Sequence, residues 1–261
     1  MQANFRFLIK LNTNSIAGHT FVKVDVVDST NNFAAKLLKD KILDVGSVIM
    51  ADFQTKGKGQ RGKEWQSEPG ENLLCSMIVQ PTSIRASEQF YLTMAVSLAI
   101  YETLIDLGIE EVQIKWPNDI YVKGKKICGI LIESNLSGDR FDNVILGMGL
   151  NVNQKIFSLP LATSLGVELG VILNRREVLE ALVANVDAAM HQLRMRNLSY
   201  LREQYHEKLL YLNAPSAYIY RGSHIEAILI GIDEQGRLLL DRTNDKSRLV
   251  VDLHEIEFIH P

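Results

Sequence analysis

A glycine-rich loop, Gly57–Lys63, contains the residues of this sequence whose types and spacing most clearly suggest chemistry. From position 55 to position 64 the chain has four cations and one anion, interleaved with three glycines. Glycine lets backbone amides approach a ligand closely, and lysine and arginine attract phosphates and carboxylates. The loop predicts a cradle for an anionic substrate. A solvated basic hairpin remains the alternative that the loop alone does not exclude.

The same loop matches two nucleotide-binding patterns, the dinucleotide fingerprint G-x-G-x-x-G and the phosphate loop G-x-x-x-x-G-K. Both patterns need a helix directly after the loop, because the N-terminal amides of that helix hold the phosphate. Pro69 and Gly70 fall where this helix would run, so no helix is expected. Glu64 occupies the position that requires a hydroxyl, and its carboxylate would repel phosphates. Neither pattern therefore explains the loop.

The overall composition is that of a globular protein with one large domain, or a large and a small one. The chain has 261 residues, of which 46% are apolar and 23% charged, and its net charge of −3 gives no general attraction to nucleic acid or to an anionic membrane. Two cysteines, Cys75 and Cys128, argue against a disulfide framework. No run has the length of a signal sequence or a membrane span, so a cytoplasmic protein is expected.

Apolar patterns predict the elements that must position the loop. Capping residues at 28–32 predict a helix that begins near Asn31. The clearest helix is expected at 87–107, with Gly108 as its stop, and 163–210 is expected to be helical. Strands are expected at 21–27, 45–51, 72–80, 112–116, 120–122, 127–133 and 143–151. Short links between successive strands indicate hairpins, so we expect an α+β fold with a mixed, largely antiparallel sheet and flanking helices.

The pattern changes from Pro215 to five short strands separated by polar turns. This change predicts a small C-terminal β-barrel, joined to the rest of the chain near residues 211–214. The expected organisation is a catalytic domain over residues 1–212 and a barrel over residues 213–261.

Five motifs follow one another in the chain: D28-S-T-N31, Q54-T-K-G-K-G-Q-R-G-K-E-W65, K115-W-P-N-D119, K126-I-C-G-I-L-I-E133 and G147-M-G-L-N151. In this order they resemble the biotin protein ligase family, in the short form without an N-terminal DNA-binding domain. The resemblance covers about residues 21–153, and the barrel extends it more loosely. It implies a class II synthetase-like biotinyl/lipoyl ligase fold.

The resemblance implies a two-step reaction. The biotin carboxylate attacks the α-phosphate of ATP to give biotinyl-5′-adenylate and pyrophosphate, and a lysine of a biotin carboxyl carrier domain then attacks the mixed anhydride. Bringing a carboxylate against a polyphosphate requires concentrated positive charge, which Mg²⁺ usually assists. ATP and biotin are then substrates, and the carrier belongs to a biotin-dependent carboxylase.

The resemblance also implies a role for individual residues. Charge at the reacting carboxyl and phosphoryl oxygens would be stabilised by Lys126, Arg61 and Lys63. The biotin-binding residues would be Ser29, Thr30, Asn31, Gln54, Lys58, Gly59, Gln60 and Lys126. The ATP-binding residues would be Arg61, Lys63, Trp65, Asn118, Gly129 and Asn151, with Trp65 stacked on adenine.

Several of these residues have structural interpretations that the sequence leaves open. Trp65 and Trp116 are also typical core aromatics. Ser29 to Asn31 also suit a helix cap. Asp119 is a candidate magnesium ligand that no spacing supports. Gln60 departs from the family, since many members have Arg there; we expect the adenylate to be held less tightly as a result.

Three other functions are weighed against the biotin ligase. A lipoate or octanoate ligase or transferase has a similar fold, and Cys128 could serve as its acyl acceptor. A biotin-sensing regulator would need a DNA-binding domain, for which the 20 residues before the first expected strand are too few, so no DNA is expected. A module that only stores biotin would not need the cationic loop. The sequence leaves a homodimer open, and we expect the loop at 54–64 to be mobile until ligand binds.

Overall fold

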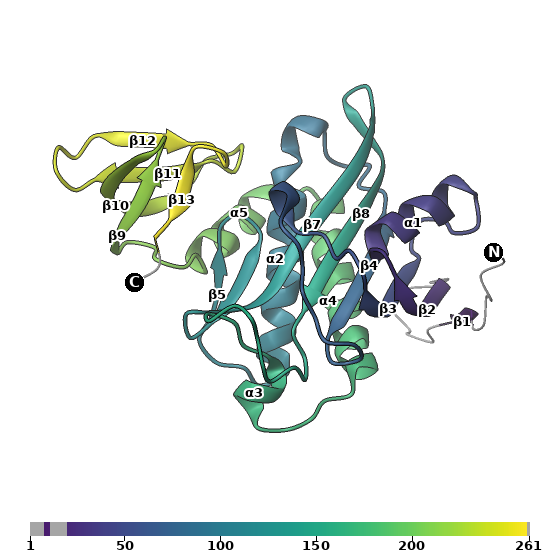
Figure 1. Cartoon of the computed structure of the whole chain (residues 1–261). Coiled ribbons are helices and arrows are strands. Elements are labelled where there is room, and N and C mark those ends of the chain that lie inside the picture. The colour runs from purple at the N-terminus through teal and green to yellow at the C-terminus, as the bar shows by residue number, and fades with distance from the viewer. Residues whose placement is uncertain (1–7, 11–19, 260–261) are drawn as a thin grey trace.

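The computed structural model describes residues 8–10 and 20–259, and its main feature is an eight-stranded sheet (Figure 1). The strand order is β1-β2-β3-β4-β8-β7-β6-β5. Strands β2 and β3 pair in parallel, and the other neighbouring pairs are antiparallel. The strands are β1 (Leu8–Lys10), β2 (Thr20–Val27), β3 (Val48–Gln54), β4 (Leu73–Val79), β5 (Val112–Lys115), β6 (Asp119–Val122), β7 (Lys125–Ser137) and β8 (Arg140–Leu150).

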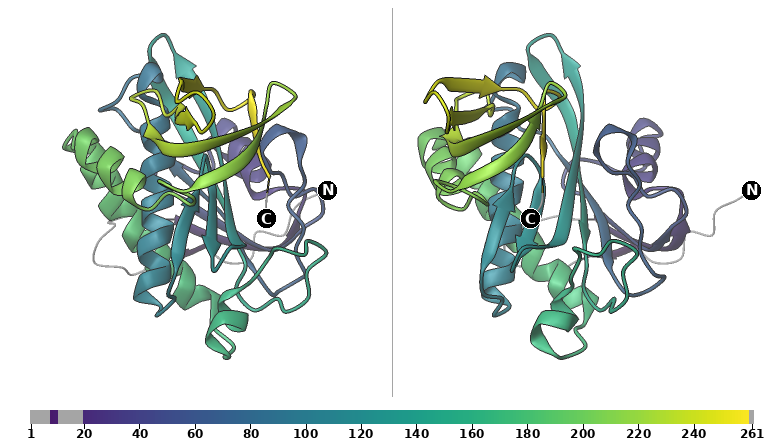
Figure 2. Two further views of the ribbon diagram at one scale, coloured as in Figure 1. Left: turned by 90° about the vertical axis from the view of Figure 1, so that its left-hand side faces the viewer. Right: turned by 60° about the vertical axis from the view of Figure 1, so that its left-hand side comes forward.

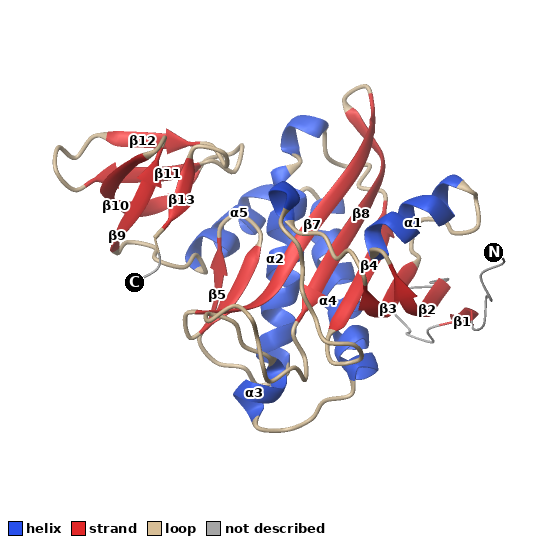
Figure 3. Cartoon of the chain, in the orientation of Figure 1, coloured by secondary structure: helices blue, strands red, loops and turns tan. Residues whose placement is uncertain are grey.

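Helices cover the two faces of this sheet unequally (Figure 3). The helix α1 connects β2 to β3 and packs on one face with a small apolar cluster that includes Ala34, Leu37 and Ile145. The helices α2 and α4 pack together on the opposite face, where the large core forms. The helices are α1 (Thr30–Lys39), α2 (Phe90–Asp106), α3 (Leu165–Leu169), α4 (Arg175–Arg194) and α5 (Leu198–Glu207).

A second, five-stranded antiparallel sheet follows α5 at one end of the molecule (Figure 2). Its order is β12-β11-β10-β9-β13, which is consistent with the small barrel expected from the sequence. Its strands are β9 (Pro215–Tyr220), β10 (Ser223–Ile232), β11 (Leu238–Arg242), β12 (Arg248–Val251) and β13 (Ile256–Phe258). The division of the chain at residue 212 stays a prediction.

Trp116 joins the two sheets. Its indole is buried, and its Nε1 donates a hydrogen bond to the carbonyl oxygen of Gly236 at 2.8 Å. Phe90 packs against the same Gly236. Trp116 is therefore a core aromatic, which is the structural interpretation that the sequence offered for it.

The expected strands, the main helices and the largely antiparallel sheet are confirmed. Two details differ. The short strand β1 was not expected, and the helical region expected at 163–210 is broken into three helices. The break between α3 and α4 has a local cause, because Gly170 ends α3 in a left-handed conformation and Asn174 caps α4. The first seven residues, on which the expectation of no signal sequence partly rests, lie outside the described residues. Among the described residues no helix is long and apolar enough to cross a membrane.

The half-buried Asp187 on α4 makes stability depend on pH. Burial raises the pKa of Asp187 to about 6, although the charge of Arg194 acts against this. The folded pKa exceeds the unfolded one, so the stabilising contribution is present below about pH 4 and is lost as the pH rises through 6. We therefore expect Asp187→Asn to raise the free energy of unfolding by about 1 kcal/mol at pH 8, a value discounted for partial exposure, and much less at pH 4.5. Urea denaturation at both pH values measures this, with Asp142→Asn at an exposed position as control; an equal gain at both would contradict it.

Candidate active site

A chain of polar side chains links the start of α1 to the sheet. Gln54, at the end of β3, accepts hydrogen bonds at its Oε1 from the backbone amide of Thr30 (2.7 Å) and from the Thr30 hydroxyl (3.1 Å). The buried Ser76 on β4 lies 2.8 Å from the Thr30 hydroxyl and 2.6 Å from Oδ1 of Asn31. The parallel pairing of β2 and β3 brings these segments together, since α1 starts where β2 ends. Ser29 is the N-cap of α1 and is buried, but its side chain makes no capping hydrogen bond.

Asn31 is held on the sheet above Gly147 of β8. A Cβ atom at Gly147 would collide with the Asn31 amide, so glycine is required for this close approach. The Asn31 Nδ2 donates to the carbonyl oxygen of Leu131 (3.2 Å) and to Oε2 of Glu133 (2.8 Å). Because Oδ1 also faces Ser76, both polar ends of the amide are bonded to protein atoms.

Lys58, from the glycine loop, reaches the same cluster. Its Nζ donates to Oδ1 of Asn32 at 2.6 Å and lies 3.7 Å from Oε1 of Glu133. Asn32 in turn donates to Asp28 at 2.6 Å. Burial tends to raise the pKa of Asp28, but hydrogen bonds from Asn32 and Ser29 and the charge of Lys58 lower it overall. The loop is thus tied to the start of α1.

The second cluster surrounds Lys126, at the start of β7. Its Nζ forms an ion pair with Oδ1 of Asp119 at 2.7 Å, and both side chains are about three-quarters buried. The same Nζ lies 5.7 Å from the centre of the Trp65 ring, a distance that allows a cation–π contact. The indole lies over two glycines of neighbouring strands, Gly129 and Gly149, where added Cβ atoms would stand 3.0 and 2.6 Å from the ring. These glycines form a flat platform for Trp65.

Positive charge is concentrated beside this cluster. The pKa of Lys115 is lowered, first by burial and then by the charges of Lys126 and Lys63, against the opposing effect of Asp119. The Lys115 Nζ lies 5.3 Å from the centres of the Tyr121 and Phe258 rings. Sequence reasoning quoted Lys115 in a motif but gave it no role. The structure places it among the charged groups Asp119, Lys126 and Lys63.

The glycine loop folds back on itself, and no helix follows it, as Pro69 and Gly70 led us to expect. The amide of Gly59 donates to the carbonyl oxygen of Lys63 at 2.7 Å, and the amide of Trp65 donates to that of Gly57 at 3.0 Å. A single 3-10 turn spans Gln60–Gly62, with Arg61 in a left-handed conformation (φ 57°). Arg61 and Lys63 are exposed, so their side chains are open to an anion in solution.

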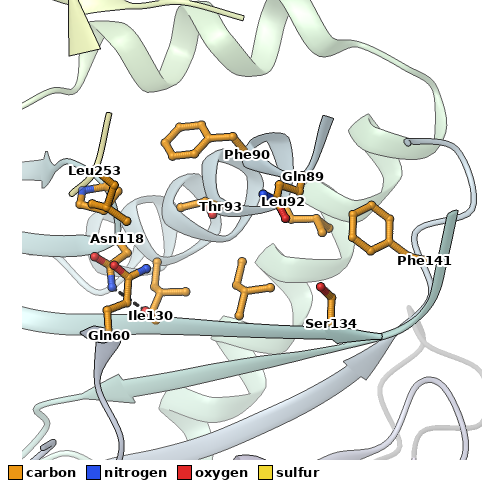
Figure 4. A pocket seen from close by; sticks show the side chains of 12 residues that line it. Gln60, Gln89, Phe90, Leu92, Thr93, Asn118, Ile130, Ser134, Phe141 and Leu253 are labelled. Atoms are coloured by element: carbon orange, nitrogen blue, oxygen red, sulfur yellow. Dashed lines mark hydrogen bonds between the residues drawn. The ribbon is translucent and has the colours of Figure 1, made fainter. Parts of the chain in front are cut away.

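A cavity of about 190 Å³ lies on the α2 side of the sheet (Figure 4). Gln60 and Asn118 meet at one end of it, near Ile130, and Phe141 and Ser134 lie at the other end. The Asn118 Nδ2 donates to the carbonyl oxygen of Ile130 at 2.6 Å. The residues around Trp65 and Asn31 are on the opposite face of the sheet. The structure therefore separates Gln60 and Asn118 from the charged groups around Lys126 and Trp65.

Two further candidates from the sequence, Asn151 and Cys128, are buried in the structure. Asn151 is buried, and its Nδ2 donates to the carbonyl oxygen of Thr163 at 2.9 Å, which holds the segment after β8. Cys128 is fully buried on the α2 side, and burial raises the pKa of its thiol. Burial likewise raises the pKa of Cys75 to about 12. Among the described residues no group of three or more His, Cys, Asp and Glu side chains is arranged to hold a metal ion.

Comparisons with known proteins place this fold among the biotin/lipoate-type protein ligases. A model of the biotin/lipoate A/B protein ligase family matches residues 24–151. The "Biotin--[acetyl-CoA-carboxylase] ligase" of Mycobacterium tuberculosis is 31% identical over 233 residues, which cover 86% of this chain and 85% of that protein. The "Bifunctional ligase/repressor BirA" of Escherichia coli K12 is 30% identical over 239 residues, which cover 86% of this chain and 70% of that protein.

A solved structure shares the whole architecture. The biotin protein ligase from Aquifex aeolicus in complex with biotin and ATP superposes with a TM-score of 0.77 at 26% sequence identity, covering 92% of this chain and 99% of that one. The chain therefore belongs to the biotin protein ligase family.

Proposed function

We propose that this protein is an ATP-dependent biotin protein ligase. It activates biotin as biotinyl-5′-adenylate and then transfers biotin to a lysine of a biotin carboxyl carrier protein. The observation that supports this most strongly is the position of Lys126, which joins Asp119, the Trp65 platform and the cationic surroundings of Lys63 and Lys115. A carboxylate and a polyphosphate both need such charge in order to approach each other.

The start of α1 supplies the biotin subsite in this proposal. The Thr30 hydroxyl and the Gln54 amide present both donor and acceptor groups, as a neutral ureido ring requires. Asn31 fixes these groups through Ser76. Lys58 and Gly59 cover the tail and the reacting carboxylate, and Ser29 closes the buried end of the subsite. Gln60, whose side chain lies beside Asn118 in the cavity, joins them when the loop closes on the ligand.

The nucleotide subsite lies at Trp65 and the glycines beneath it. The indole stacks on adenine, while Arg61 and Lys63 meet the phosphates from the exposed loop. Asn118 and Asn151 act at its border, through the backbone segments that they hold. Magnesium enters as part of the ATP substrate, bound by phosphate oxygens. Lys126 neutralises the charge that develops between carboxylate and α-phosphate, and Asp119 holds its amine in place.

Pyrophosphate exchange into ATP by the purified protein tests this function. We expect exchange with biotin and none with lipoate, octanoate or no added acid. Exchange with lipoate or octanoate would assign the chain to that other activity. Cys128 gives little support to an acyl-cysteine route, because its thiol is buried and the pKa of the thiol is raised. Labelled acyl-thioester on Cys128 without ATP would reverse this choice.

The acceptor and the assembly state extend the proposal. The protein substrate is a carrier domain of a biotin-dependent carboxylase. We expect the protein to be located in the cytoplasm with that substrate. A homodimer remains a prediction. A labelled biotin transfer assay with a purified carrier domain, followed by sedimentation of the ligase with and without biotin and ATP, examines both points.

Gln60 should weaken the retention of the adenylate. Its side chain is neutral and lies beside Asn118. Many members of the biotin protein ligase family have arginine at the position of Gln60. The loop at 54–64 is expected to close on the ligand, and in the Gln60→Arg variant this closure would bring the new guanidinium to the intermediate, so we expect biotinyl-adenylate to dissociate about tenfold more slowly. Stopped-flow release of the adenylate measures this. Gln80→Arg, at an exposed position after β4, is the control, and an unchanged off-rate in Gln60→Arg would reject the explanation.

A further inference from the structure

We propose that Glu133 is a positioning residue for the biotin subsite, fixing the start of α1 and the glycine loop to the sheet at once. The inference rests on the proposed function. Glu133 lies on β7 opposite Ile145 of β8, far in the sequence from the segments it contacts. No role was assigned to it from the sequence.

The two oxygens of its carboxylate contact two different segments. Oε2 accepts a hydrogen bond from the Asn31 amide at 2.8 Å, at the start of α1. Oε1 lies 3.7 Å from Nζ of Lys58, in the loop that is expected to cover biotin. The carboxylate of Glu133 thus contacts both segments from the sheet.

The two contacts differ in strength, which makes them separable. Asn31 is 3% exposed, so its hydrogen bond to a charged oxygen is shielded from water. The Lys58 pair has side chains 43% and 42% exposed and a longer separation, so its contribution is small. Removing the charge of Glu133 should therefore loosen the glycine loop only slightly. Removing the whole Glu133 side chain should also free the Asn31 amide.

The Asn31 amide cannot take a different partner without cost. Its Oδ1 is committed to Ser76, and its Nδ2 is shared between Glu133 and the carbonyl oxygen of Leu131. Since Ser76 also contacts Thr30, a shift of Asn31 would move the hydroxyl that is expected to face the biotin ring. Glu133 therefore acts on biotin through Asn31 and Lys58, without touching it.

Two substitutions separate these effects. Glu133→Gln keeps the shape and an acceptor for Asn31 but removes the charge that faces Lys58. We expect biotin to dissociate about threefold faster from this variant and more than tenfold faster from Glu133→Ala. Lys58→Met removes this pair together with the hydrogen bond to Asn32, so its effect should be at least as large, and the double variant should show no increase beyond Lys58→Met. Asp142→Asn on the same hairpin removes a carboxylate outside the cluster and is the control.

Two measurements on the full chain test the proposal. The first is the rate of biotin dissociation, together with KM for biotin and kcat in pyrophosphate exchange; we expect KM to rise while kcat stays nearly constant. The second is hydrogen exchange at residues 57–63 without ligand, which should be faster in Glu133→Gln. Unchanged dissociation in Glu133→Ala, an additive double variant, or faster exchange without any effect on biotin would each overturn the inference. A wild-type protein that binds no biotin but shows the exchange difference would overturn the proposed function and leave only the anchoring contact.

Discussion

Lys126→Met should lower the rate of biotin-dependent pyrophosphate exchange by about 10²–10³-fold, the loss typical for removal of one preorganised charge-stabilising group. The Lys126 amine is held 2.7 Å from Asp119 and against the Trp65 ring, so it is already in position before substrate binds. Methionine keeps most of the side-chain volume and removes the charge. The loss should therefore appear in kcat more than in KM.

Lys125 provides a matched control for this variant. It is the adjacent residue of β7 and is exposed, so Lys125→Met removes the same charge one position away. We expect that variant to retain nearly wild-type exchange. Equal losses in both variants would show that the effect comes from the general positive field, and an active Lys126→Met would remove Lys126 from the chemistry.

The local elements were predictable because their signals are local. Gly108 ends α2 in a left-handed conformation (φ 85°), as its position after the helix indicated. Pro69 and Gly70 excluded a helix after the glycine loop, and Gly70 indeed turns with φ 78°. The antiparallel hairpin of β7 and β8 followed from the short link around Gly138. In each case a residue with a restricted or special backbone decided the structure.

The pairing of distant strands was not predictable in the same way. β4 pairs with β8, so Ser76 and Gly147 become neighbours although the sequence separates them by 71 positions. That register decides that Asn31, Glu133 and Lys58 form one cluster. A pattern along the chain reports which face a side chain takes, but it does not report the partner strand. The motifs were therefore found from sequence, whereas the contacts that join them were not.

The cavity shows a second limit of sequence reasoning. Gln60 and Asn118 were expected in two different subsites, and they line the same cavity on the α2 face (Figure 4). Lys115 and Asp119 stand in one quoted motif, but their importance depends on Lys63 and Lys126 lying near them. Electrostatic roles of this kind depend on the distances between charged groups and on their burial. Neither quantity can be read from one residue of the sequence.

Gly149→Ala should raise KM for ATP by about tenfold to a hundredfold, because a single methyl group would displace Trp65. An added Cβ atom would stand 2.6 Å from the indole, well inside van der Waals contact. Within the described residues the buried Nε1 of Trp65 has no hydrogen-bond partner, so the ring is held by packing on the glycines and by its contact with the Lys126 amine. Displacement would remove the surface on which we place adenine. Biotin binding in the absence of ATP should change much less, since the start of α1 is untouched.

A double-substitution cycle shows whether the methyl group acts through the indole. Trp65→Ala alone should also raise KM for ATP, and adding Gly149→Ala to it should have little further effect, because the collision no longer exists. Steady-state exchange at saturating biotin measures KM for the four proteins, and thermal melting confirms that each is folded. Additive effects would mean that Gly149→Ala disturbs β8 itself. In that case the glycine platform would be a requirement of the sheet, and the placement of adenine on Trp65 would lose its main structural support.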